Sequence, residues 1–139
     1  MLIRGKEELS LYISQNNIRY FRASEFRCRH CGEIVIESRV IEILERLRIY
    51  FGKPIVITSA YRCRVHNKRV GGVPNSAHTR GYAVDIKCTN SSDRQRILEF
   101  LLGERVKRIG IHPRFIHFDL DPEKPSPRVW LYTKRRHVA

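Results

Sequence analysis

Two short segments rich in β-branched and aromatic residues, 106–112 and 115–120, are separated only by Pro113 and Arg114. A two-residue link joins neighbouring antiparallel strands, because parallel strands need a crossover of about a dozen residues or more. The chain therefore should contain an antiparallel hairpin. Other segments with strand composition can extend the same sheet: residues 54–59, 82–87 and 129–133.

Apolar side chains recur at helical spacing in three other stretches: residues 7–18, 40–51 and 93–102. Ser38 precedes the second stretch as an N-cap, and Ser92 with Gln95 forms a capping box at the third. About three helices beside a small, mostly antiparallel sheet predict an α+β fold. A chain of 139 residues can bury one core, so we expect a single domain spanning residues 1–139.

The chain is strongly basic, with 27 Lys and Arg against 14 Asp and Glu, a net charge of +13. Such a charge favours polyanionic partners, which include nucleic acids, acidic membrane surfaces and anionic bacterial wall polymers. The basic residues are spread along the chain, with Lys134-Arg135-Arg136 the densest cluster. Nucleic-acid-binding modules often concentrate their basic residues in one place, so a specific nucleic-acid partner is disfavoured. The alternative to any polyanionic partner is that the charge serves only solubility.

Targeting signals are missing from the sequence as given. No apolar run approaches the length of about 18–20 residues that spans a bilayer, and the first residues lack the apolar core of a secretory signal. We therefore expect a protein without a transmembrane segment, synthesised in the cytoplasm. We also expect it to be a monomer.

Polar side chains interrupt two of the expected strands. In residues 115–120, strand alternation places His117 and Asp119 on the face opposite the apolar side chains. In residues 82–87 the same alternation sets Asp85 apart from its apolar neighbours, and a carboxylate in such a strand needs a partner.

A metal ion is one such partner. His78 stands seven residues before Asp85, at the end of the long Gly- and Pro-containing segment 61–81, and Gly81 supplies the turn into the strand. Together with His117, these residues form a set of three ligands. Zinc held by three protein groups keeps a fourth position for water, as in hydrolytic sites. The alternative interpretation is that the three residues are ordinary polar side chains on a sheet.

Residues 76–85, Ser-Ala-His-Thr-Arg-Gly-Tyr-Ala-Val-Asp, resemble the Ser-x-His-x-x-Gly-x-Ala-x-Asp motif of the zinc D-alanyl-D-alanine carboxypeptidase family. His117-x-Asp119 resembles the second metal motif of this family, and the likeness extends from about Phe26 to Asp119. The family includes wall-trimming carboxypeptidases, phage endolysins and muramyl endopeptidases, and shares its α+β fold with the signalling domain of hedgehog proteins.

The resemblance implies that His78, Asp85 and His117 bind zinc and that the chain hydrolyses peptide bonds in peptidoglycan stem peptides. Arg62 would bind the substrate carboxylate or stabilise the oxyanion, unless it is a surface arginine. Ser76 would donate a hydrogen bond to the substrate, unless it only forms a turn.

Three functions agree with this resemblance. The first is a D-Ala-D-Ala carboxypeptidase, the second an endopeptidase that cleaves the L-Ala to D-Glu bond, and the third a non-catalytic, metal-bearing basic binding protein. Stem peptides and anionic wall polymers are the expected partners, and the protein would act at the cell wall if released.

The general base departs from the family pattern. Several branches carry a glutamate three residues before the last zinc histidine, where this chain has Arg114, which cannot accept a proton. His112 and Asp119 are the remaining candidates. The intrinsic pKa of a histidine is better suited to proton transfer near neutral pH, which favours His112. Asp119 is the alternative, although an aspartate in this position more often orients a metal-binding histidine than acts as a base.

The four cysteines form a second motif. Cys28-x-x-Cys31 followed by glycine has the spacing of a zinc knuckle, and Cys63 with Cys88 would complete a closed site of four thiolates. Reduced thiols and a disulfide are the alternatives. The remaining histidines have no partner at metal-binding spacing: His30, His66 and His137.

Overall fold

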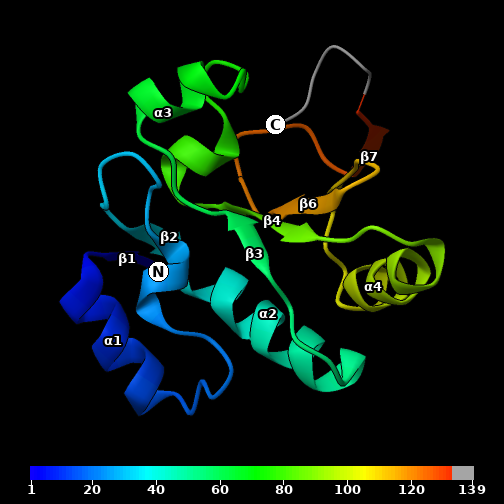
Figure 1. The fold of residues 1–139 in the computed structure, drawn as a ribbon, viewed down its shortest axis with the longest axis horizontal. Coiled ribbons are helices and arrows are strands. Elements are labelled where there is room, and N and C mark those ends of the chain that lie inside the picture. The colour runs from blue at the N-terminus through cyan, green and yellow to red at the C-terminus, as the bar shows by residue number, and fades with distance from the viewer. Residues whose placement is uncertain (133–139) are drawn as a thin grey trace.

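The fold combines two small sheets with short helices (Figure 1), and the computed structural model describes residues 1–132. Its helices are α1 (Lys6–Gln15), α2 (Ser38–Phe51), α3 (Arg64–Arg69) and α4 (Ser91–Gly103), together with the 3-10 helices η1 (Ala23–Phe26) and η2 (Ala77–Arg80). Its strands are β1 (Leu2–Arg4), β2 (Val35–Glu37), β3 (Ile57–Ser59), β4 (Ala83–Lys87), β5 (Arg108–Ile111), β6 (Phe115–Asp119) and β7 (Arg128–Leu131).

The larger sheet has the strand order β3-β4-β6-β5-β7. Its strands pair antiparallel except β5 and β7, which are parallel. The predicted hairpin is confirmed, because β5 and β6 pair antiparallel across Pro113 and Arg114. A separate two-stranded sheet joins β1 to β2. The α+β fold class is therefore confirmed.

The apolar face of the larger sheet forms the core. Helices α2 and α4 lie below this sheet in Figure 1, and α3 lies on the other side. Strand alternation gives each central strand one apolar and one polar face. The buried core contains Val84 and Ile86 of β4, Ile116 and Phe118 of β6, Val40, Ile41, Leu44 and Leu47 of α2, and Ile97 and Leu101 of α4.

Both predicted helix caps were wrong. Glu37 is the N-cap of α2, and Ser38 is its first helical residue. Helix α4 begins at Ser91, and the Asn90 side chain caps it by accepting a 2.9 Å hydrogen bond from the backbone N–H of Asp93. Asparagine caps helices as well as serine does. Asn90, which precedes Ser92 in the chain, can therefore start α4 in place of Ser92.

Several elements are too short to show a period in the sequence. Strands β1 and β2 have three residues each, and α3 and η2 lie inside segment 61–81, which was expected to be a loop. Among the described residues, no helix has both the length and the apolar character needed to cross a bilayer. The strand predicted over residues 129–133 corresponds to β7, which ends at Leu131. The basic cluster Lys134-Arg135-Arg136 and His137 lie outside the described residues.

Candidate metal centre

The short helix η2 carries His78 to the polar face of the larger sheet. Ser76 caps this helix, because its buried hydroxyl accepts a 3.2 Å hydrogen bond from the backbone N–H of His78. Gly81 ends it at φ +84°, and a Cβ atom there would lie 2.8 Å from the carbonyl oxygen of Val35. The chain can therefore turn back into β4 at this position only with a glycine. The turn predicted at Gly81 is confirmed.

Asp85 and His117 lie directly opposite each other on β4 and β6, so their side chains share the polar face. His78 Nε2 lies 3.1 Å from Asp85 Oδ1 and 3.2 Å from His117 Nδ1, and the latter two atoms are 2.9 Å apart. All three residues are at most 1% exposed. The structure thus brings the three predicted ligands together in one buried cluster.

The second nitrogen of each imidazole is held by an acceptor. His78 Nδ1 lies 2.7 Å from the carbonyl oxygen of Ala60, and His117 Nε2 lies 2.7 Å from Asp119 Oδ2. Each of these oxygens can hold a proton on the nitrogen that it faces, His78 Nδ1 or His117 Nε2. The other two nitrogens, His78 Nε2 and His117 Nδ1, face Asp85 Oδ1 and can donate to a metal ion bound among them, an arrangement typical of metal-binding histidines.

The electrostatics of the cluster suit a cation. Burial alone would raise the pKa of Asp85, but His78 and His117 beside it hold that pKa far below its usual range. Burial lowers the pKa of His78, which keeps its ring neutral. Burial also opposes protonation of His117, but hydrogen bonds to Asp119 and Asp85 raise its pKa above the usual value.

The spacing of the donor atoms fits zinc. Tetrahedral ligands at about 2.0–2.1 Å from a zinc ion lie about 3.3 Å from one another. The three separations in the cluster, 2.9, 3.1 and 3.2 Å, are close to this value. His78, Asp85 and His117 can therefore hold a zinc ion after only small shifts and leave a fourth position open.

Comparison with known proteins agrees with this geometry. The family model for peptidase M15 matches residues 8–119, a span that contains all three candidate ligands. The chain belongs to the peptidase M15 family. M15 peptidases are zinc-dependent, so membership supports a zinc-dependent metallopeptidase. No curated protein matches the chain.

Arg62 of this M15 peptidase lies behind Asp85. Its Nε donates to Ser59 Oγ at 2.9 Å, and its two terminal nitrogens donate to Asn67 Oδ1 at 3.0 Å and to Asp85 Oδ2 at 3.3 Å. Its side chain is 1% exposed, so the alternative of a surface arginine was wrong. The arrangement requires Gly72, because a Cβ atom there would lie 2.0 Å from Asn67 Oδ1.

Asp119 lies behind His117. Its Oδ2 faces His117 Nε2, and its Oδ1 accepts from Arg108 Nε at 2.8 Å and from the backbone N–H of Asp121 at 3.1 Å. Burial would raise the pKa of Asp119, but His117 and then Arg108 lower it overall. Both carboxylate oxygens of Asp119 thus have partners, and one of them fixes the orientation of a candidate zinc ligand.

His112 shares the sheet face of His117. Gly110 pairs with His117, so His112 follows on the same face and its backbone N–H bonds the carbonyl of Phe115 at 3.0 Å. Its ring stacks on Phe115, with centroids 4.4 Å apart. Its Nδ1 accepts a 3.0 Å hydrogen bond from the backbone N–H of Arg114.

The cysteines divide into a group of three and one separate residue. All four are free thiols, and the Sγ atoms of Cys28, Cys31 and Cys63 lie within 4.8 Å of one another. Cys88 belongs instead to the hydrophobic core, with its Sγ 3.8 Å from the carbonyl oxygen of Asn90. The expected site of four thiolates was therefore wrong, because the start of the β4–α4 connection faces the core.

Two features of the cysteine group were not visible in the sequence. Burial would raise the pKa of Cys28, but hydrogen bonds from the backbone N–H groups of Cys63, Cys31 and His30 outweigh it and lower the pKa to about 7. His30 Nδ1 lies 3.5 Å from Cys63 Sγ, so the expectation that His30 has no partner was wrong.

Proposed function

We propose that this M15 peptidase hydrolyses peptide bonds in peptidoglycan stem peptides, as a carboxypeptidase of the D-Ala-D-Ala type. The observation that carries the proposal is the convergence of His78 Nε2, Asp85 Oδ1 and His117 Nδ1 at zinc-ligand spacing in a chain of this family. Zinc held there would supply a Lewis acid for the scissile carbonyl and lower the pKa of a water molecule.

Arg62 and Asp119 are positioning residues in this proposal. The guanidinium of Arg62 is buried against Asp85 and holds this carboxylate in place through a 3.3 Å hydrogen bond to Oδ2. Asp119 holds the Nε2 proton of His117 and so leaves Nδ1 as the donor atom. We therefore do not assign either side chain to direct contact with the substrate, and Ser76 acts as the cap that orients His78.

His112 is the residue that we propose to meet the substrate. Because the N–H of Arg114 donates to His112 Nδ1, the neutral ring carries its proton on Nε2. In this tautomer Nε2 donates a hydrogen bond and cannot accept a proton. Stabilisation of the negative charge that develops on the carbonyl oxygen is therefore favoured over the role of general base.

The surface beside η2 suits an acidic peptide. A pocket of about 600 Å³ lies next to this helix, and its wall includes Tyr61, Arg64, Lys68 and Arg80. Stem peptides carry free carboxylates, which such basic side chains attract. A smaller pocket of about 200 Å³ reaches Asp85 between Arg62 and Phe115.

Digestion of purified peptidoglycan followed by mass spectrometry tests the function. A carboxypeptidase should shorten pentapeptide stems by one alanine and release free D-alanine. Cleavage of the L-Ala to D-Glu bond would instead expose a new amino group on glutamate and would replace the proposed specificity. A digest identical to the enzyme-free control would contradict hydrolysis and favour the binding protein.

The net charge of +13 leads to a prediction on wall binding. Binding to anionic wall preparations should weaken steeply as salt rises through the physiological range, because exposed charges are screened beyond a Debye length of about 8–10 Å. Sedimentation of the protein with walls at increasing salt measures this. Binding that does not change with salt would contradict an electrostatic partner, and equally tight binding to DNA would contradict specificity for the wall.

A further inference from the structure

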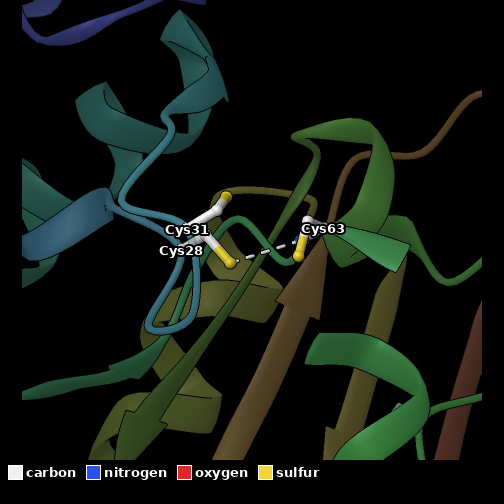
Figure 2. Close-up of side chains that lie close together, drawn as sticks. All are labelled: Cys28, Cys31 and Cys63. Atoms are coloured by element: carbon white, nitrogen blue, oxygen red, sulfur yellow. Dashed lines mark hydrogen bonds between the residues drawn. The ribbon is translucent and has the colours of Figure 1, made fainter. Parts of the chain in front are cut away.

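Three cysteines from two segments that are distant in the sequence meet next to Arg62, because Cys63 directly follows it in the chain. Figure 2 shows Cys28 and Cys31, from the loop between η1 and β2, facing Cys63. Cys63 immediately precedes α3 and caps it, because its Sγ accepts from the backbone N–H of His66 at 3.4 Å. All three Sγ atoms lie within 4.8 Å of one another.

The local backbone supports this arrangement. The carbonyl oxygen of Cys28 accepts from the N–H of Gly32 at 2.9 Å, so the loop turns back on itself and brings Cys31 beside Cys28. The N–H groups of Cys63 and His30 point at Cys28 Sγ, at 3.3 and 3.5 Å. Hydrogen bonds of this kind stabilise a thiolate, which is the form that binds metal.

The sulfur–nitrogen distance matches that of a tetrahedral zinc site, and the three Sγ atoms lie within 4.8 Å of one another. With Zn–S bonds of about 2.3 Å and a Zn–N bond of about 2.1 Å, two sulfur ligands lie about 3.8 Å apart, and a sulfur and a nitrogen ligand about 3.6 Å apart. His30 Nδ1 lies 3.5 Å from Cys63 Sγ. His30 is exposed, so its ring is free of core packing and can turn toward the other two sulfurs.

We propose that Cys28, Cys31 and Cys63, with His30 as the fourth ligand, bind a structural zinc ion separate from the hydrolytic centre. Four protein ligands close the coordination shell, which is typical of structural and not catalytic zinc. A disulfide between any two of the cysteines would leave the third thiol unused, whereas zinc engages all three.

The proposed zinc would connect two parts of the fold that are far apart in the sequence. It would join the η1–β2 loop to the start of α3, directly after Arg62. Because the side chain of Arg62 holds Asp85, the site would fix the backbone behind the hydrolytic centre. Its loss should lower thermal stability, since metal that binds only the folded state stabilises that state.

Zinc analysis of matched cysteine variants tests the proposal. The wild-type chain should contain about two zinc ions, and Cys31→Ser about one. Cys31 is exposed, so this substitution leaves the core intact. Cys88→Ser is the matched control, because Cys88 lies outside the cluster, and it should keep both ions. Equal zinc content in wild type and Cys31→Ser would overturn the proposal.

Cobalt substitution separates this site from the hydrolytic centre. In His78→Ala, whose hydrolytic centre should be empty, bound Co²⁺ should still give intense thiolate-to-cobalt charge-transfer absorption. The same absorption should disappear in Cys31→Ser, whether or not the protein hydrolyses peptidoglycan. No thiolate absorption in His78→Ala, or fewer than four titratable thiols in the unfolded metal-free chain, would overturn the site. Unchanged zinc affinity in His30→Ala would overturn the fourth ligand.

Discussion

Replacing His78 or His117 by alanine should remove zinc from the hydrolytic centre and reduce peptidoglycan hydrolysis on the order of 10³-fold or more. A Lewis acid supplies several kcal/mol of transition-state stabilisation, and about 1.4 kcal/mol corresponds to a tenfold change in rate. Each substitution removes one of three converging donor atoms, so two protein ligands remain. Zinc content, rate of hydrolysis and circular dichroism of the folded protein are the measurements.

Asp119→Asn is the graded control for these variants. It keeps all three ligands but replaces the carboxylate that holds His117 Nε2, and loss of such a partner weakens metal affinity by about 10–100-fold. Its zinc content should therefore recover when excess zinc is added, unlike that of His117→Ala. A folded His78→Ala protein with full hydrolytic activity and unchanged zinc content would show that the ligands are assigned wrongly.

The faces of the ligand-bearing strands could be predicted because they depend on local structure. Strand alternation alone placed Asp85 and His117 on a polar face, and their pairing across β4 and β6 made them neighbours. The partners behind the ligands carried no such signal. The partner of His78 at Ala60 is a backbone carbonyl oxygen, which any residue would supply, so the residue type gives no clue. Asn67 reaches Arg62 only because of the way α3 folds.

The cysteine group shows the same limit. The Cys28-x-x-Cys31 spacing is local, so the sequence predicted that these two thiols lie together. The other members depend on which way distant segments face. Cys88 is buried in the hydrophobic core, whereas His30 meets Cys63 only because the η1–β2 loop packs beside the start of α3.

His112→Ala should keep the hydrolytic zinc but reduce the rate of hydrolysis by about 10²–10³-fold, which is the effect of removing one oxyanion donor. The ring occupies the same sheet face as His117, and its Nε2 carries the proton because Nδ1 accepts from the N–H of Arg114. His112 is also stacked on Phe115, so thermal unfolding should be compared with wild type to separate loss of rate from loss of fold.

His112→Gln distinguishes a hydrogen-bond donor from a base. The glutamine amide donates but does not accept a proton, so this variant should recover most of the wild-type rate if His112 Nε2 acts as a donor. A general base would leave His112→Gln as slow as His112→Ala and would remove one limb of the pH–rate profile. Near-full turnover of His112→Ala, together with loss of turnover in zinc-loaded Asp119→Asn, would assign proton transfer to Asp119 despite the partners on both of its oxygens.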